Sequence, residues 1–289
     1  MQKNSNFLNL LLSLLIAGTY IIPHNLCAKS TFQENGIPTK ELKKVFQLLG
    51  VCVDTLAEAN EFAQKNFLRT GERWEKQPET ELHKIILENK APLLEALKAL
   101  GMIDRIMPPQ KSYTYALLIG GLKNTVAQRL DFLAKLIEQG LTIEFLVLLG
   151  GERQLRDIER EELPATVTTE AQMMVHLYAQ HPTLKNYKSL LVNAPMTQKA
   201  DGTFTRPTSE NTLTHFAKIV PHDGACLVIS NNPHLVRQTM VARRILDQSR
   251  FCTDGAGQEA AENSPHTIIL MDEFANALHE EFRQVQPVK

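Results

Sequence analysis

Apolar residues follow two different patterns along the chain. Over residues 38–107 they recur at steps of three and four, as Leu42, Val45, Phe46 and Leu49 do, which is the spacing of one helix face. A second stretch of this kind, residues 82–100, contains Pro92, and a proline breaks the interior of a helix. We therefore expect a helical N-terminal region over residues 29–110, with two helices in its second half.

After Pro109 the pattern changes to short, continuous apolar runs, each followed by a helical pattern. Continuous runs are typical of strands that are buried on both faces of a parallel sheet. The five predicted strands are Tyr113–Ile119, Phe145–Leu149, Leu190–Asn193, Ala225–Ile229 and Thr267–Met271. The five predicted helices are Thr125–Glu138, Thr168–Ala179, Ser209–Ile219, Pro233–Asp247 and Asp272–Arg283.

This alternation predicts an α/β domain over residues 111–289, with a three-layer, doubly wound and mainly parallel sheet. Ligands of such sheets bind beyond the carboxyl ends of the strands. The loops that follow the strands are therefore where we look for chemistry.

The first 28 residues have the layout of a secretory signal peptide. A polar start with Lys3 precedes an apolar run over residues 7–22, and Ala28 offers a small residue for cleavage. We expect export, to a periplasmic location. The run is short for a bilayer span of about 20 residues, and the alternative is an uncleaved inner-membrane anchor over residues 7–22. Only in that case do we expect membrane contact.

Charge and cysteine content narrow the classes of partner. The net charge is -1 and no run of Lys and Arg stands out, so we expect no nucleic-acid partner. Cys226 lies in a predicted buried strand, whereas a Cys52–Cys252 disulfide is an option in an oxidising compartment. No cysteine or histidine has the spacing of metal ligands, so we predict no metal site.

Residues suited to an anion follow the predicted strands. Glycine pairs at 120–121 and 150–151 allow a close approach of backbone N–H groups, and helix N-termini carry partial positive charge. Arg129 and Arg237 stand near helix N-termini, where a cation is unfavourable by about 0.3–1 kcal/mol, which indicates a bound anion. The remaining candidate ligand-binding residues are Ser209, Asn211 and Thr212. A phosphate or a carboxylate fits these donors best.

Two residues near the same strand ends are candidates for acid and base chemistry. Glu170 and His234 have side chains that can transfer protons near neutral pH. Structural roles compete with each assignment: Glu170 can serve only as a first-turn acid, and Ser209 or Asn211 only as helix caps. Arg237 can pair with Asp272 or Glu273 on the surface.

Several short motifs, in order, resemble the SanA/YdcF/ElyC-like family, which is also known as a domain of unknown function. They comprise Gly120-Gly121 after a strand, Arg129, Leu149-Gly150-Gly151, Thr169-Glu170-Ala171, Ser209-Glu210-Asn211-Thr212 and the segment from Ser230 to Arg237. The resemblance covers residues 113–245. Two positions depart from it: Arg206-Pro207 stands where the family often has an acidic residue, and His215 where it tends to have Asn.

The resemblance implies a setting in the cell envelope, where several members are linked to cell-wall precursors or lipid carriers. Our first hypothesis is an exported protein that binds a phosphate-bearing envelope metabolite, free or lipid-linked, and acts as a hydrolase or transferase. The alternative is a non-catalytic sensor or scaffold whose helices at residues 38–107 bind a protein partner. No residue pattern identifies a cofactor; Gly-x-Ser-x-Gly, P-loop and His-Glu-x-x-His signatures are absent from the sequence.

Overall fold

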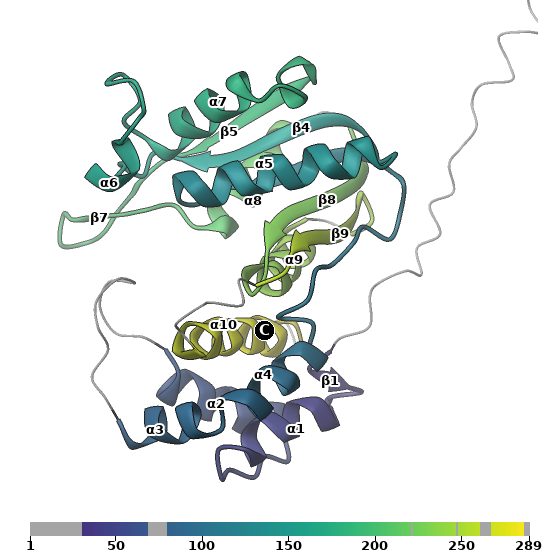
Figure 1. Ribbon diagram of the computed structural model, residues 1–289, viewed down its shortest axis with the longest axis vertical. Helices are drawn as coiled ribbons and strands as arrows, with labels where there is room; N and C mark the ends of the chain where they lie inside the picture. The colour runs from purple at the N-terminus through teal and green to yellow at the C-terminus, as the bar shows by residue number, and fades with distance from the viewer. Residues whose placement is uncertain (1–30, 69–79, 221, 247, 261–266, 286–289) are drawn as a thin grey trace, which may run out of the picture.

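A five-stranded parallel sheet forms the centre of the molecule (Figure 1). The computed structural model describes residues 31–68, 80–220, 222–246, 248–260 and 267–285, and the predicted signal peptide or anchor lies outside these ranges. The strands are β3 (Ser112–Ile119), β4 (Thr142–Gly151), β5 (Ser189–Ala194), β8 (Gly224–Asn231) and β9 (Phe251–Gln258). They are arranged in the order β5-β4-β3-β8-β9, and every neighbouring pair is parallel.

Helices cover both faces of the sheet. One face packs against α5 (Lys123–Glu138) and α7 (Glu170–Gln180), and the other against α8 (Ser209–Ile219) and α9 (His234–Ile245). The predicted three-layer, doubly wound α/β fold is thereby confirmed. The strand order reverses between β3 and β8, which makes the carboxyl ends of these strands a topological switch point.

Short elements complete this part of the chain. A turn of helix, α6 (Asp157–Arg160), and a 3-10 helix (Leu184–Asn186) lie in the connections around α7. A small hairpin of β6 (Thr197–Gln198) and β7 (Phe204–Thr205) precedes α8.

The N-terminal region is helical, as predicted. It contains a hairpin of β1 (Gln33–Glu34) and β2 (Ile37–Pro38), then α1 (Lys40–Gln47), α2 (Leu56–Asn66), α3 (Glu81–Glu88) and α4 (Lys90–Ala99). The predicted break near Pro92 is confirmed, but it occurs at Asn89. Pro92 lies in the first turn of α4, where backbone N–H groups have no partner within the helix in any case.

The prediction of a fifth strand at Thr267–Met271 is wrong. These residues begin α10 (Thr267–Val285), and the fifth strand is β9, whose sequence FCTDGAGQ has no continuous apolar run. β9 is mostly buried, but its buried positions include small and polar residues such as Thr253, Asp254 and Ala256, so no apolar run marks it. The start of α10 is apolar because this helix is buried between α9 and the N-terminal helices.

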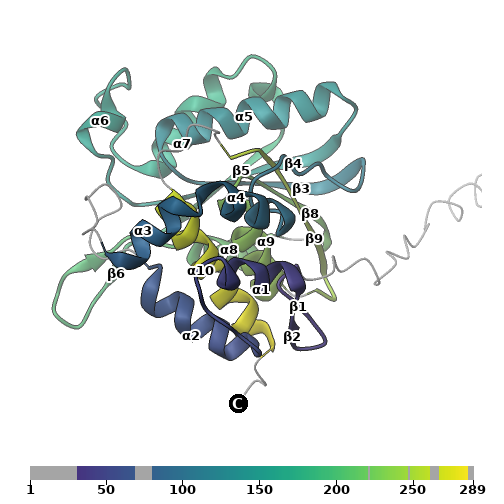
Figure 2. The same ribbon diagram turned by 60° about the horizontal axis from the view of Figure 1, so that its bottom comes forward.

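The helices α1–α4 and α10 form a helical layer. α10 lies at its centre, among α1–α4 and next to α9 (Figures 1 and 2). The ring of Phe274 is 5.9–6.1 Å, centroid to centroid, from the rings of Phe32, Phe46 and Phe67. Met240 of α9 belongs to the same apolar core. The helical layer and the sheet are therefore joined through continuous packing.

The sequence left a Cys52–Cys252 disulfide as an option, and the structure does not contain this bond. Cys52 belongs to the helical layer and Cys252 to β9, so the two thiols stand on different parts of the fold. Cys226 is buried in β8, as predicted. Within the described residues, no helix is long and apolar enough to cross a bilayer.

We expect Phe274→Ala to lower the free energy of unfolding by about 3–5 kcal/mol, because it leaves a cavity where three other aromatic rings meet. Urea denaturation followed by circular dichroism measures this effect. Phe204→Ala is the matched control: Phe204 is 60% exposed, and its loss should change stability by less than about 0.5 kcal/mol. Equal effects of the two variants would contradict the packing described.

Candidate functional site

A polar cavity of about 300 Å³ lies at the switch point, beyond the carboxyl ends of β3 and β4. The first turns of α5, α7, α8 and α9 all contribute to its wall. Four arginines and one glutamate line it: Arg129, Arg153, Arg206, Arg237 and Glu170. Of the predicted site residues, the cavity also brings together Gly120, Gly121, Ser209, Thr212 and His234.

Arg129 is the most deeply buried charged group in the wall of the cavity, with 3% of its surface exposed. Its guanidinium donates hydrogen bonds to the carbonyl oxygens of Ile119 and Gly120, at 2.8 and 2.6 Å, and to the side-chain oxygen of Asn231, at 2.7 and 3.0 Å. Burial lowers the pKa of Arg129 to about 10, so the group stays cationic at neutral pH. Within the described part of the chain it forms no ion pair. The charges of Glu170 and Glu273 act on it only from beyond ion-pair distance, and a buried cation without a direct partner attracts an anion.

Gly120 lets the end of β3 lie very close to β4 and α7. A Cβ atom there would lie 2.9 Å from the carbonyl oxygen of Leu149 and 3.0 Å from the side-chain carboxyl carbon of Glu170. Gly121 is less constrained, since its nearest contact would be the Arg129 guanidinium at 3.4 Å. The absence of a side chain at 120 therefore lets Glu170 and Arg129 flank the same stretch of backbone.

Glu170 and Glu159 share one arginine, but their pKa values are shifted in opposite directions. The carboxylate of Glu159 accepts two hydrogen bonds from Arg153, at 2.8 and 2.9 Å, whereas Glu170 is 3.5 Å from the same guanidinium. Burial raises the pKa of Glu170 above its ordinary value, and the charge of Arg153 offsets this only in part. At Glu159 burial acts in the same direction, but the hydrogen bonds from Arg153 outweigh it and the pKa is lowered. Glu170 is thus the carboxyl group best suited to hold a proton.

His234 and Arg237, one turn apart at the start of α9, bind the same buried carboxylate. Nδ1 of His234 is 3.0 Å from one oxygen of Glu273, and Nε of Arg237 is 2.9 Å from the other. The side chain of Glu273 is 1% exposed, while those of His234 and Arg237 are each 22% exposed. The suggested pairing of Arg237 with Glu273 is real, but it is buried and not on the surface.

The N-cap of α8 is Thr208, whereas Ser209 and Asn211 were the caps considered from the sequence. The side-chain oxygen of Thr208 accepts from the backbone N–H of Asn211, and the Asn211 side chain accepts from the N–H of Thr208. Asn211 is therefore a capping residue and does not line the cavity. The hydroxyl of Thr212 donates to the carbonyl oxygen of Ser209 at 3.0 Å, which leaves the Ser209 hydroxyl as the freer donor.

Gly150 and Gly151 also stay outside the cavity wall. A Cβ atom at Gly150 would lie 2.8 Å from the Cα atom of Ala171, and one at Gly151 would lie 2.2 Å from Cγ of Pro207. These glycines let α7 and the segment before α8 pack against β4. Their role is close packing, which the sequence does not distinguish from ligand contact.

Sequence reasoning did not assign Arg153, Arg206, Thr125 and Gln238 to the site. Arg153 directly follows the Gly150-Gly151 pair, so its place after a strand was a usable signal. Arg206 stood out only as a departure from the family pattern. Its charge nevertheless acts on Glu170, where it offsets part of the rise in pKa. No pattern in the sequence indicates that Glu273, in a helix far along the chain, lies under His234.

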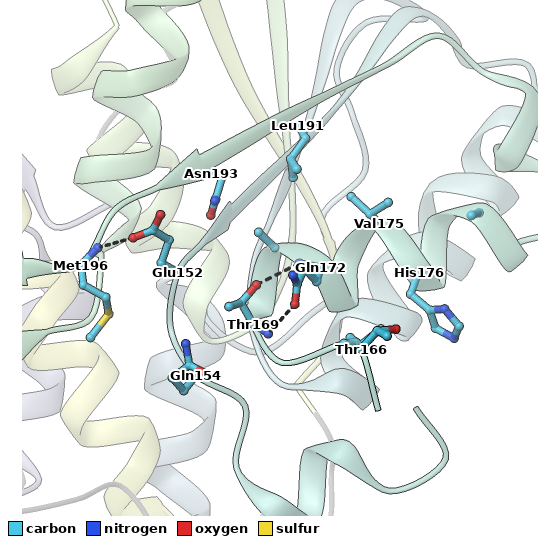
Figure 3. Close-up of a pocket in the computed structure, with 13 residues that line it drawn as sticks. Glu152, Gln154, Thr166, Thr169, Gln172, Val175, His176, Leu191, Asn193 and Met196 are labelled. Carbon is cyan, nitrogen blue, oxygen red and sulfur yellow. Dashed lines mark hydrogen bonds between the residues drawn. The ribbon is translucent and has the colours of Figure 1, made fainter. Parts of the chain in front are cut away.

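A larger groove of about 840 Å³ runs beside α7 and the edge strand β5 (Figure 3). It is lined by apolar side chains such as Val175 and Leu191 and by polar ones such as Asn193, but by no arginine or lysine. Glu152 accepts from the backbone N–H of Met196 there. Because the groove has no cation to hold an anion, the polar cavity remains the better candidate for chemistry.

Comparison with models of known protein families found no match, and comparison with curated proteins found none either. The resemblance to the SanA/YdcF/ElyC-like family stays a prediction. Within the described ranges, no cluster of three or more His, Cys, Asp or Glu side chains could hold a metal ion. The residues that line the cavity are therefore the main guide to the function.

Glu170→Gln should raise the free energy of unfolding at pH 7. The folded protein raises the pKa of this carboxyl, so its ionised form is disfavoured by folding. As the pH falls through that raised pKa, Glu170 becomes protonated and the advantage of the variant should disappear. Urea denaturation between pH 7 and pH 4 measures both effects.

Glu159→Gln is the matched control, since Glu159 binds the same Arg153 but has a lowered pKa. This variant should lose about 1–3 kcal/mol at pH 7, the usual consequence of weakening a buried charged hydrogen bond. A stability loss in Glu170→Gln as large as that in Glu159→Gln would contradict the assignment of opposite environments.

Proposed function

We propose that the polar cavity binds a phosphate group of an envelope metabolite and that the protein acts as a phosphate-ester hydrolase or transferase. Four guanidiniums line the cavity. Two of them have carboxylate partners, in the pairs Arg153–Glu159 and Arg237–Glu273, and the positive charge of Arg129 and Arg206 favours an anionic ligand. Phosphate suits them, because guanidinium groups bind its oxygens in pairs. The free hydroxyl of Ser209 and the first turns of four helices add further donors.

The single observation that carries this proposal is the buried Arg129. Desolvating a cation is costly unless an opposite charge compensates it, and within the described residues no carboxylate pairs with this guanidinium. Its hydrogen bonds to Ile119, Gly120 and Asn231 fix its position and leave one N–H of the guanidinium for a ligand. A bound phosphate supplies the missing negative charge.

His234 acts as the base of the reaction, and Glu170 acts as its acid. The oxygen of a water or an acceptor hydroxyl attacks phosphorus and gives its proton to His234, while the bond from phosphorus to the leaving oxygen breaks. Glu170 gives a proton to that leaving oxygen, a role that its raised pKa supports. The guanidiniums of Arg129 and Arg237 stabilise the charge on the phosphoryl oxygens.

The setting of this activity is part of the proposal. The signal-like layout of residues 1–28 and the resemblance over residues 113–245 support an exported, periplasmic protein. They also support a phosphorylated envelope precursor, free or lipid-linked, as the ligand.

Arg129→Gln should weaken binding of inorganic phosphate by roughly 10- to 100-fold, the effect of losing one charged hydrogen-bonding partner. Arg237→Gln should weaken it to a similar or smaller extent. Isothermal titration calorimetry on residues 30–289 measures both, and the same titration extends to phosphorylated envelope metabolites. Arg105→Gln is the control, since Arg105 is exposed and pairs with Glu259 outside the cavity. Tight phosphate binding by Arg129→Gln would refute this assignment of the site.

His234→Ala should lower the rate of phosphate release by about 10²–10⁴-fold. This applies to any phosphorylated metabolite that the wild-type protein hydrolyses. The colorimetric assay of released phosphate measures the rate, and circular dichroism checks that the variant is folded. Unchanged turnover in folded His234→Ala would remove this residue from the mechanism.

A non-catalytic sensor or scaffold is the second candidate, and one feature favours it. An open groove of about 670 Å³ lies between α1 and α4, lined in part by Lys40, Lys44 and Pro92. A partner bound there would contact the layer that contains α10. Phosphate binding without turnover of any metabolite, together with partner capture lost in Lys44→Glu, would support this role over catalysis.

A further inference from the structure

Glu273 reaches the cavity from an unexpected part of the fold. It lies on α10, in the helical layer, whereas the other residues of the site follow strands of the sheet. Its carboxylate is completely buried beneath His234 and Arg237. A buried carboxylate held by two side chains of a candidate site is a positioning group in many enzymes.

Both neighbours of this carboxylate must be donors. Arg237 donates from Nε to one oxygen at 2.9 Å and from Nη2 to the other at 3.3 Å, and a guanidinium has no acceptor. An ionised carboxylate is only an acceptor. Burial by itself raises the pKa of Glu273. The charge of His234 when its ring is protonated, the charge of Arg237 and the hydrogen bonds from both side chains outweigh it, so the pKa lies well below its ordinary value. Nδ1 of His234, 3.0 Å away, must therefore carry a hydrogen.

We infer that Glu273 is a positioning residue that holds His234 as the Nδ1–H tautomer, with Nε2 left as the proton acceptor facing the cavity. This inference rests on the proposed function for its catalytic meaning. When Nε2 takes the proton of the attacking oxygen, the ring becomes a cation beside a carboxylate that stays ionised. The proton remains on His234 until it leaves to solvent, so Glu273 never transfers one.

The helical layer gives this carboxylate its fixed place. The next residue, Phe274, is fully buried among aromatic rings from the N-terminal region. Gln64 of α2 donates to the backbone carbonyl of Ala275 at 2.9 Å, and Asn60 contacts His279 at 3.2 Å. The N-terminal helices thus have a function for the site, because they hold the helix that orients its base.

Glu273→Gln tests the inference sharply. A glutamine has one oxygen and one amide nitrogen, and Arg237 requires the oxygen. The amide N–H must then face His234, which turns Nδ1 into an acceptor and moves the ring hydrogen to Nε2. We expect His234 to change from mostly Nδ1–H to mostly Nε2–H. Nitrogen NMR of the full chain labelled with ¹⁵N-histidine measures this, with His234→Gln used to assign the signal.

Glu280→Gln is the matched control. Glu280 is a second buried carboxylate of α10, two turns further on, and it binds Arg244 outside the cavity. This variant should leave the His234 tautomer unchanged. Glu273→Asp keeps both acceptor oxygens and should retain at least part of the Nδ1–H tautomer, which keeps the test informative if Glu273→Gln folds poorly.

The outcomes separate the two proposals. Persistence of the Nδ1–H tautomer in Glu273→Gln, or the same change in Glu280→Gln, overturns the positioning role. Inorganic phosphate should bind Glu280→Gln within about threefold of the wild-type Kd, since Glu280 pairs with Arg244 outside the cavity. Failure of the wild type to bind phosphate would instead refute the proposed function and leave the tautomer result standing.

Discussion

The reversal of strand order between β3 and β8 is the constraint from which the site follows. Chain connections on the two sides of this point lead to opposite faces of the sheet, so α5 and α9 diverge from neighbouring strand ends. The space between them cannot be closed by the backbone of either helix. Side chains from four helix starts fill its wall, and most of the charged ones are arginines.

The environment of each carboxyl group then decides what it can do. Glu159 and Glu273 each accept hydrogen bonds from a guanidinium at 2.8–2.9 Å and have lowered pKa values. Glu170 lies 3.5 Å from its arginine, next to Gly120, and has a raised pKa. The three glutamates thus differ in environment: two hold cations in place, and the pKa of the third favours its protonated form more than usual.

The fold could be predicted from the sequence where burial left a clear pattern. The central strands are continuous apolar runs because helices cover both of their faces. β9 escaped prediction because small and polar residues occupy its buried positions. One of them, Gly257, packs against the carbonyl oxygen of Ser230, where a Cβ atom would lie 2.6 Å away. The apolar start of α10 imitated a strand, because a helix buried on most sides also lacks polar positions.

The site was predictable only where its residues directly follow strands. Arg129, His234 and Arg237 were found in this way, and they do line one cavity. Gly150 and Gly151 have the same sequence signal but serve packing, which depends on how near α7 and Pro207 approach. Glu273 was named from the sequence only as a possible surface partner of Arg237, after a predicted strand that is in fact the start of α10. Its partners lie 36 residues or more away along the chain, and only tertiary structure brings them together.

The place of α10 has a consequence for how the protein is made. The N-terminal helices leave the ribosome before the sheet, yet the aromatic core that they share with Phe274 cannot close until α10 follows. A nascent chain therefore has exposed apolar helices, and a His234 without Glu273, until α10 has been synthesised. Completion of folding and completion of the site become one event, because the same helix finishes both.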